Sequence, residues 1–328
     1  MDEKTLVIVL GETREHELTF ENFKANVLDV LKADLCVCIG IADDYDIRNP
    51  YYEEARYRFT YPEPDDYGDA LEGATKFILS GKGKTETFNG ETVYRRSWRE
   101  FLKIKDQLMG GIRDEMDEQP GSGAILLFYR WYLLKNLEEC NLLSDYDYFV
   151  ITRSDFVYML PHPTMDLFDK EFMWFPNAQN YGGITDRHVV LPRRFVVPYL
   201  DMLPKMMLTS NEYYTKMAVK TGWNLEQFIK FHLEQHGLLS FVRRFPYIMY
   251  TVRSRKGKTR WSDGKWSDEL GYFIKYPGEH WRGETIQKEY GASTLSIKEF
   301  YKMALRNILK EEHWPIAFSD QCPRQSRS

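Results

Sequence analysis

Polar side chains and glycines follow three of the predicted strands, and their types suit the binding of a phosphorylated sugar. These groups are Gly11-Glu12-Thr13-Arg14, Arg153-Ser154-Asp155 and Gly182-Gly183-Ile184-Thr185-Asp186-Arg187. Arginine can pair with phosphate oxygens, and adjacent glycines let the backbone approach a ligand with no side chain in the way. Because parallel α/β sheets bind ligands at the carboxyl ends of their strands, we look for the site at this edge.

Arg153 and Asp155 are the most informative of these residues. A departing diphosphate needs its charge neutralised, which Mg²⁺ or Mn²⁺ does by bridging two phosphate oxygens. These cations prefer carboxylate oxygens and keep several waters, so one or two aspartates suffice. We therefore expect Asp155 to bind the metal and Arg153 to pair with phosphate. The alternative is an ordinary Arg–Asp pair at a strand end, and the acidic segment Asp43-Asp44-x-Asp46 is a rival metal or nucleoside site.

Gly182 to Arg187 and Glu226 provide further candidates. Asp186 and Arg187 follow the two glycines, where they could hold a sugar hydroxyl and a phosphate, although two glycines also suit a tight turn. Glu226 lies in the first turn of a predicted helix, after a predicted cap at Asn224. A carboxylate there could accept a proton from a hydroxyl group, or it could simply complement the helix dipole. Both interpretations stay open.

Strands alternating with helices are expected to position these residues. Continuous apolar runs predict buried strands at 6–10, 34–41, 147–152 and 172–176. Spacing of apolar residues predicts helices at 19–31, 97–116, 125–140, 194–207, 225–235 and 296–310. Residues 42–75 are expected to form loops or short elements, and 240–252 alternates like a strand. The order predicts an α/β fold with a mainly parallel sheet.

The overall composition excludes some partners. The net charge is −5 and the basic residues form no single stripe, which argues against a nucleic-acid partner. The strongest basic stretch, RSRKGKTR at 253–260, could meet phosphate or form a solvated loop. No apolar run approaches the length of a membrane span. Cys36 and Cys38 lie on one face of a single strand and are poorly placed to pair, and no signal-peptide pattern opens the chain, so we expect a cytoplasmic protein.

Four segments in this order resemble the GT-A-like nucleotide-sugar glycosyltransferases that assemble surface polysaccharides in bacteria and large algal viruses. They are Gly11-Glu12-x-Arg14 with Phe23-Lys24-x-Asn26 and Ala33-Asp34-Leu35, the strand Tyr146 to Asp155, the loop Pro176-x4-Tyr181-Gly182-Gly183-x2-Asp186-Arg187, and the helix Asn224-x-Glu226-x2-Ile229-x3-Leu233-x3-Gly237. The resemblance covers roughly residues 5 to 253. It implies a Rossmann-like GT-A fold and transfer of a sugar from a nucleotide-diphosphate donor, most often a UDP-sugar, to a glycan or glycoprotein hydroxyl.

The resemblance also implies a role for each matching residue. Gly11, Glu12 and Arg14 would border the nucleotide, Arg153 and Asp155 would meet the diphosphate and the metal, and Asp186 with Arg187 would meet the donor sugar. Gly182 and Gly183 would let the backbone come close to the bound donor. Glu226 would be the base, with Asp186 as its alternative. These enzymes usually carry Asp-x-Asp at the metal site, and this chain has Arg153 in the first position, which puts strict metal dependence in doubt.

The expected organisation is a catalytic domain at 1–253 and an extension at 254–328 that packs on its acceptor side. Two other classes of function remain open. A nucleotidyltransferase or phosphohydrolase would prefer a nucleoside triphosphate and centre on Asp43 to Asp46. A non-catalytic carbohydrate-binding protein would bind sugar without nucleotide or metal.

Overall fold

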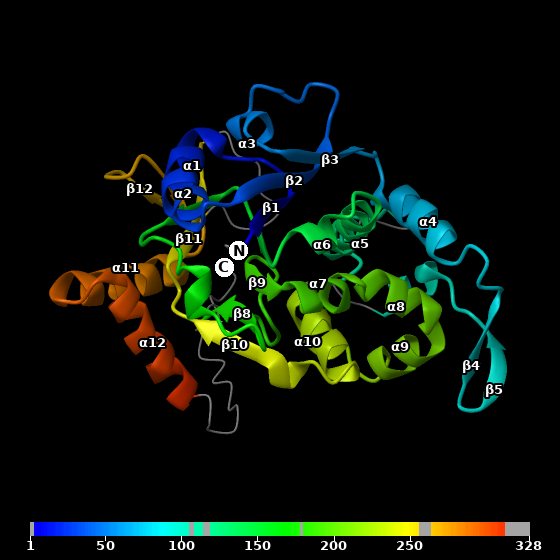
Figure 1. Cartoon of the computed structure of the whole chain (residues 1–328). Helices are drawn as coiled ribbons and strands as arrows, with labels where there is room; N and C mark the ends of the chain where they lie inside the picture. The colour runs from blue at the N-terminus through cyan, green and yellow to red at the C-terminus, as the bar shows by residue number, and fades with distance from the viewer. Residues whose placement is uncertain (1–2, 105–107, 114–118, 178–179, 256–263, 312–328) are drawn as a thin grey trace, which may run out of the picture.

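The computed structural model describes residues 3–104, 108–113, 119–177, 180–255 and 264–311. In this part of the chain a seven-stranded sheet runs through the molecule in the order β10-β8-β9-β6-β1-β2-β3 (Figure 1). Its strands are β1 (Thr5–Gly11), β2 (Asp34–Ile41), β3 (Tyr57–Pro62), β6 (Tyr148–Thr152), β8 (Met173–Pro176), β9 (Val189–Pro192) and β10 (Val242–Phe245). β9 runs antiparallel to β6 and β8, while the other neighbouring pairs are parallel.

The central strands are buried on both faces, which explains their unbroken apolar sequences. In β1, Leu6, Ile8 and Leu10 join one hydrophobic cluster, whereas Val7 and Val9 join the other. Successive side chains of a strand point to opposite faces, so each strand contributes to two cores. Cys36 and Cys38 of β2 are buried free thiols in the first cluster, as their spacing predicts.

Helices cover both faces of this sheet. The larger cluster packs against α4 (Tyr67–Ile78), α5 (Gly123–Glu139), α7 (Arg193–Leu200), α8 (Met202–Leu208), α9 (Ser210–Met217) and α10 (Leu225–Gln235). The smaller cluster packs against the helical segment formed by α1 (His16–Phe23), η1 (Lys24–Leu28) and α2 (Asp29–Leu31), together with α3 (Pro50–Glu53) and α12 (Ile297–Glu311). The predicted α/β fold with a mainly parallel central sheet between helices is therefore confirmed.

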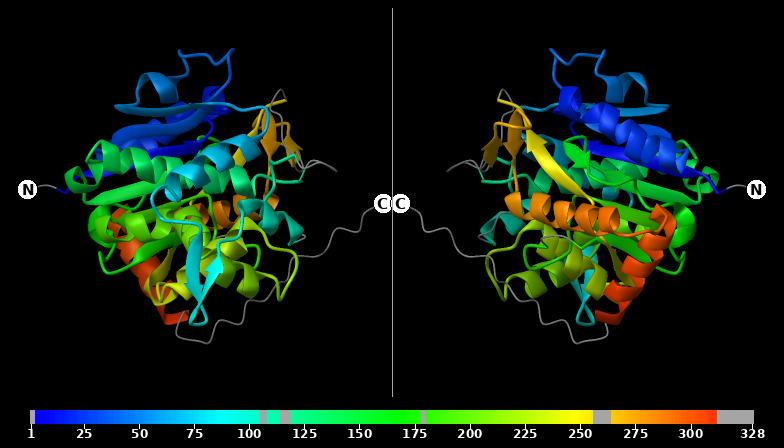
Figure 2. Two further views of the ribbon diagram at one scale, coloured as in Figure 1. Left: turned by 90° about the vertical axis from the view of Figure 1, so that its right-hand side faces the viewer. Right: turned by 90° about the vertical axis from the view of Figure 1, so that its left-hand side faces the viewer.

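A second sheet, in the order β12-β13-β11-β7, branches from the first. It contains β7 (Phe156–Tyr158), β11 (Met249–Arg253), β12 (Lys265–Ser267) and β13 (Tyr272–Ile274), with α11 (Pro277–Ala292) packed against β11 (Figure 2). Since β7 begins immediately after Asp155 and pairs with β11, the end of β6 lies where the two sheets meet. This junction brings β11 and β13, from the late part of the chain, next to the predicted strand-end residues.

The remaining elements are short. They are β4 (Thr85–Phe88), β5 (Glu91–Tyr94), α6 (Leu142–Asp145) and the 3₁₀ turns η2 (Trp98–Lys103), η3 (Met165–Leu167) and η4 (Leu239–Phe241). The hairpin β4–β5 lies on the opposite side of the molecule from α11 and α12 (Figure 1). Within the described residues, none of the helices combines the length and the apolar character needed to cross a membrane.

Two sequence-based expectations for secondary structure differ from the structure. The helix expected over 97–116 is wrong: η2 covers 98–103, and 108–113 forms turns, while 105–107 and 114–118 lie outside the described residues. Gly110 and Gly111 end any helical continuation, since Gly111 has φ 95°. The segment 42–75 contains α3, the edge strand β3 and the start of α4. Tertiary packing outweighs the weak local preferences of the polar edge strand and of a helix with internal glycines.

Candidate functional site

A pocket of about 750 Å³ opens at the carboxyl ends of the central strands. Its size is in the range of ordinary small-molecule sites. Eight of the ten predicted site residues line it: Gly11, Glu12, Arg14, Arg153, Asp155, Asp186, Arg187 and Glu226. The other two predicted residues, Gly182 and Gly183, lie beside the pocket without lining it. The fold thus brings together residues from four distant segments, and their individual roles stay predictions.

The loop after β1 is fastened to the end of β6. Gly11 ends β1 with φ 102°, a backbone conformation that favours glycine and turns the chain toward the pocket. The Ser154 hydroxyl donates to the carbonyl oxygens of Glu12 at 2.9 Å and of Arg14 at 3.0 Å. Arg14 forms an ion pair with Glu12 at the pocket wall. The hydrogen bonds from the Ser154 hydroxyl to these two backbone carbonyls therefore set the position of Arg14 relative to Arg153 and Asp155.

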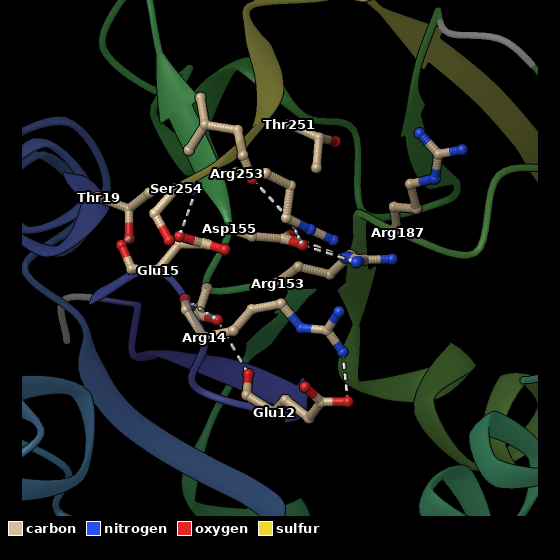
Figure 3. A network of polar contacts seen from close by, with 12 residues as sticks. Glu12, Arg14, Glu15, Thr19, Arg153, Asp155, Arg187, Thr251, Arg253 and Ser254 are labelled. Carbon is tan, nitrogen blue, oxygen red and sulfur yellow. Dashed lines mark hydrogen bonds and ion pairs between the residues drawn. The ribbon is translucent and has the colours of Figure 1, made fainter. Parts of the chain in front are cut away.

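Asp155 is buried and accepts hydrogen bonds from two arginines (Figure 3). Arg153 donates from Nε to Oδ1 at 2.9 Å and from Nη2 to Oδ2 at 2.7 Å, which is a bidentate pair. Arg253 donates from Nη1 to Oδ2 at 2.5 Å. Burial alone would raise the pKa of Asp155, but the guanidinium groups of Arg153 and Arg253 outweigh burial and hold this pKa well below its ordinary value.

These contacts do not fit the oxygen cage of a divalent cation. Both carboxylate oxygens of Asp155 already accept from guanidinium groups, and a cation on Oδ2 would lie next to two positive charges. Within the described residues there is also no group of three histidine, cysteine, aspartate or glutamate side chains arranged to hold a metal ion. The expected Mn²⁺ or Mg²⁺ at Asp155 stays a prediction. The contacts of Asp155 indicate another role for this carboxylate, which is to position Arg153 and Arg253.

Lys275, which the sequence analysis did not identify, also lines the pocket. It follows β13 and is only 7% exposed. Burial, followed by the positive charges of Arg253 and Arg153, lowers its pKa to about 7. Arg253 entered the sequence analysis only as the first residue of a basic stretch, and no pattern in the sequence indicated that it or Lys275 would meet Asp155. The rest of that stretch, from 256 to 260, lies outside the described residues.

The loop at Gly183 lies against the start of α10, and Gly183 itself faces backbone atoms of Glu226 and Gln227. A Cβ on Gly183 would lie 2.0 Å from the carbonyl oxygen of Glu226, so no other residue fits there without displacement. The Ile184 amide donates to that same carbonyl at 2.9 Å. Asn224 caps α10 by accepting from the Gln227 amide at 2.8 Å, as its position in the sequence predicts. This contact brings the loop that carries Asp186 against the helix start that carries Glu226.

Glu226 and Asp186 form a carboxylate pair on the pocket wall. Burial, reinforced by the negative charge of Asp186, raises the pKa of Glu226 to about 7. A carboxyl group with this pKa can exchange a proton near neutral pH, whereas an ordinary glutamate is a poor proton acceptor there. The backbone of Asp186 is held from the other side by Arg130, whose Nη2 donates to the Asp186 carbonyl at 3.1 Å.

Arg187 is buried and compensated by residues of the later part of the chain. Its Nη1 forms an ion pair with Glu279 of α11, and Thr251 of β11 donates to the other oxygen of Glu279 at 3.1 Å. The guanidinium carbon lies 4.3 Å from the ring centre of Tyr276, a cation–π contact. Arg187 is therefore a fixed part of the pocket wall, and Tyr276 lines the same pocket.

The rival acidic segment does not belong to this pocket. Asp43, Asp44 and Asp46 are exposed in the loop after β2, and none of them is a lining residue. Asp46 accepts hydrogen bonds from the side chain of Arg48, which lowers the pKa of Asp46.

Comparisons with known proteins give little further guidance. No protein-family model matches the chain, and no curated protein matches it in sequence. Among solved structures, the apo form of mouse xyloside xylosyltransferase 1 matches with a TM-score of 0.38 and 7% identity, covering 73% of this chain and 84% of that chain. A likeness at this level carries no argument about activity, so the functional assignment depends on the pocket itself.

Proposed function

We propose that this protein is a glycosyltransferase that moves a sugar from a nucleoside-diphosphate donor, with a UDP-sugar as the first candidate, to a hydroxyl of a glycan or glycoprotein. The supporting observation is that one pocket contains both positively charged side chains and a pair of carboxylates. Arginines and a lysine surround Asp155 at the strand ends, and the carboxylate pair Asp186 and Glu226 lies on the wall of the same pocket. A departing diphosphate needs the positive groups, and an attacking hydroxyl needs a proton acceptor.

In the proposed direct transfer, the bond between the anomeric carbon and the diphosphate oxygen breaks, and its electron pair leaves with the nucleoside diphosphate. The acceptor oxygen bonds to the anomeric carbon, and its proton passes to the carboxylate of Glu226. Asp186 would bind a hydroxyl of the donor sugar and keep the pKa of Glu226 raised. Gly11, Glu12 and Arg14 would border the nucleotide.

A ligand panel tests this proposal. The melting temperature of the full chain would be measured with UDP, GDP, ADP, the corresponding triphosphates and free sugars, each with EDTA and with Mn²⁺. A ligand that binds the native state raises the melting temperature by linkage. We expect a nucleoside diphosphate to give the largest shift, and release of that diphosphate from its sugar donors to require Glu226.

Other outcomes of the same panel contradict the proposal. A consistent preference for a triphosphate would favour a nucleotidyltransferase or phosphohydrolase. A response to free sugars with none to any nucleotide would favour a non-catalytic carbohydrate-binding protein. The response to Mn²⁺ bears on the expected metal without deciding the class of reaction.

A further inference from the structure

We propose that Arg153 and Lys275, with Arg14 at the rim, neutralise the diphosphate of the donor directly, that Arg253 adds its positive charge from a buried position beside Asp155, and that no divalent cation takes part. This inference rests on the proposed function, because it names how the same pocket binds the leaving group. Asp155 is then a positioning residue that orients two guanidinium groups and does not contact the ligand.

The first observation is an excess of positive charge around Asp155. Arg14, Arg153, Arg253 and Lys275 are all within electrostatic range of its carboxylate or of one another. They come from the β1 loop, the end of β6, the end of β11 and the residue after β13, so four separate segments converge. Figure 3 shows Arg14, Arg153 and Arg253, from the first three of these segments, near Asp155. Glu12 compensates Arg14 from a half-exposed position. Asp155 is the carboxylate that pairs with Arg153 and Arg253, and Asp186 also lies within electrostatic range of Arg153.

The second observation is that several donors of this cluster lack partners. Nε and Nη2 of Arg253 are buried and have no hydrogen-bond acceptor among the residues that the structure describes. The side chain of Lys275 lines the pocket, and in the described part of the chain its ammonium group lies 5.5 Å from the ring centre of Tyr276 but makes no hydrogen bond or ion pair. Buried ionic groups without hydrogen-bond acceptors are costly, and for Lys275, which lines the pocket while Arg253 does not, this points to an anionic ligand.

The third observation is the match between these donors and a diphosphate. Guanidinium groups bind phosphate oxygens in pairs, while an ammonium group supplies a compact point charge. Fixed positive groups in a buried pocket can stabilise a departing phosphate in the way that a metal ion does. A cation added beside Asp155 would instead increase the repulsion within the cluster.

The experiment compares binding of UDP and of inorganic pyrophosphate to the full chain by titration calorimetry, in EDTA and in Mn²⁺. We expect both ligands to bind in EDTA and the Kd to change by less than about threefold with Mn²⁺. Lys275→Met should weaken binding by about tenfold or more, since a charge-assisted contact is lost. Lys275→Arg should restore most of the affinity.

Lys288→Met is the matched control, because Lys288 is a highly exposed lysine of α11 and carries the same substitution. It should leave binding unchanged. The melting temperature of the free protein provides a second readout. Lys275→Met should melt at the same or a higher temperature than the wild type, since a buried charge is removed. A purely structural lysine would give a lower melting temperature.

The outcomes separate the two proposals. Binding of UDP in Mn²⁺ that disappears in EDTA overturns metal-free neutralisation and leaves the glycosyltransferase proposal intact. Unchanged affinity in Lys275→Met also overturns the role of the cluster. Absence of nucleoside-diphosphate binding under both conditions overturns the proposed function and this inference with it.

Discussion

Arg253 donates a hydrogen bond from Nη1 to Oδ2 of Asp155 at 2.5 Å, although 98 residues separate the two in the sequence. Both side chains are buried, and the backbone reinforces their contact, because the Val252 amide donates to the Asp155 carbonyl at 3.0 Å. This pair fastens the second sheet to the end of β6. It connects the stability of the fold to the placement of cations in the pocket.

The pair predicts a large loss of stability in Asp155→Ala. Removing one partner of a buried ion pair typically costs about 3–5 kcal/mol, because the remaining charge is left uncompensated. We expect a loss of this order in the free energy of unfolding, measured by urea denaturation. Asp46→Ala removes an exposed aspartate that is also paired with an arginine, and it should leave the unfolding curve nearly unchanged. Similar curves for the two variants would contradict the buried contact.

The backbone contact between Gly183 and Glu226 predicts that Gly183→Ala displaces the start of α10. The added methyl group would overlap the Glu226 carbonyl, so we expect a loss of at least about 2 kcal/mol in unfolding free energy. The release of nucleoside diphosphate should fall as well, since Glu226 moves. Gly73→Ala is the control, because its Cβ would enter open space on α4, and it should be neutral or stabilising.

The raised pKa of Glu226 predicts how activity depends on pH. The carboxylate must be deprotonated to accept a proton, so transfer should increase as pH rises through about 7. Glu226→Gln should reduce the rate by about 10²–10⁴-fold and abolish this pH dependence. Glu234→Gln, on the exposed side of the same helix, should keep the wild-type rate and profile. A wild-type profile that is flat between pH 6 and about 8 would contradict the assignment.

The same pKa predicts an effect on stability. The folded protein holds the Glu226 proton up to a higher pH than the unfolded chain, so stability from this group is full at low pH and declines as pH rises from about 4.5 to about 7. Above that range Glu226→Gln should be more stable than the wild type, by roughly 1–3 °C in melting temperature. Thermal melts of both proteins across this pH range measure the difference. A larger advantage of the variant at low pH would contradict the sign.

The sequence by itself determined the parallel core and the clustering of its strand-end residues. The runs at β1, β2 and β6 are apolar at every position because both faces are buried, and this local pattern is visible without a structure. Parallel strands end at a common edge, so the sequence alone predicts that Arg14, Arg153 and Asp155 lie near one site, and all three line the pocket.

Only the tertiary structure decided which partners those residues have. The sequence leads us to expect a metal ion at Asp155, but it does not reveal that Arg253, from a strand of another sheet, donates a hydrogen bond to one of the oxygens of Asp155. Lys275 and Glu279 reach the pocket through β13 and α11, in a segment whose sequence carries no strong periodicity. Contacts between residues this far apart in the sequence leave no local sequence pattern. They arise from the packing of the two sheets, and the spacing of neighbouring residues does not encode them.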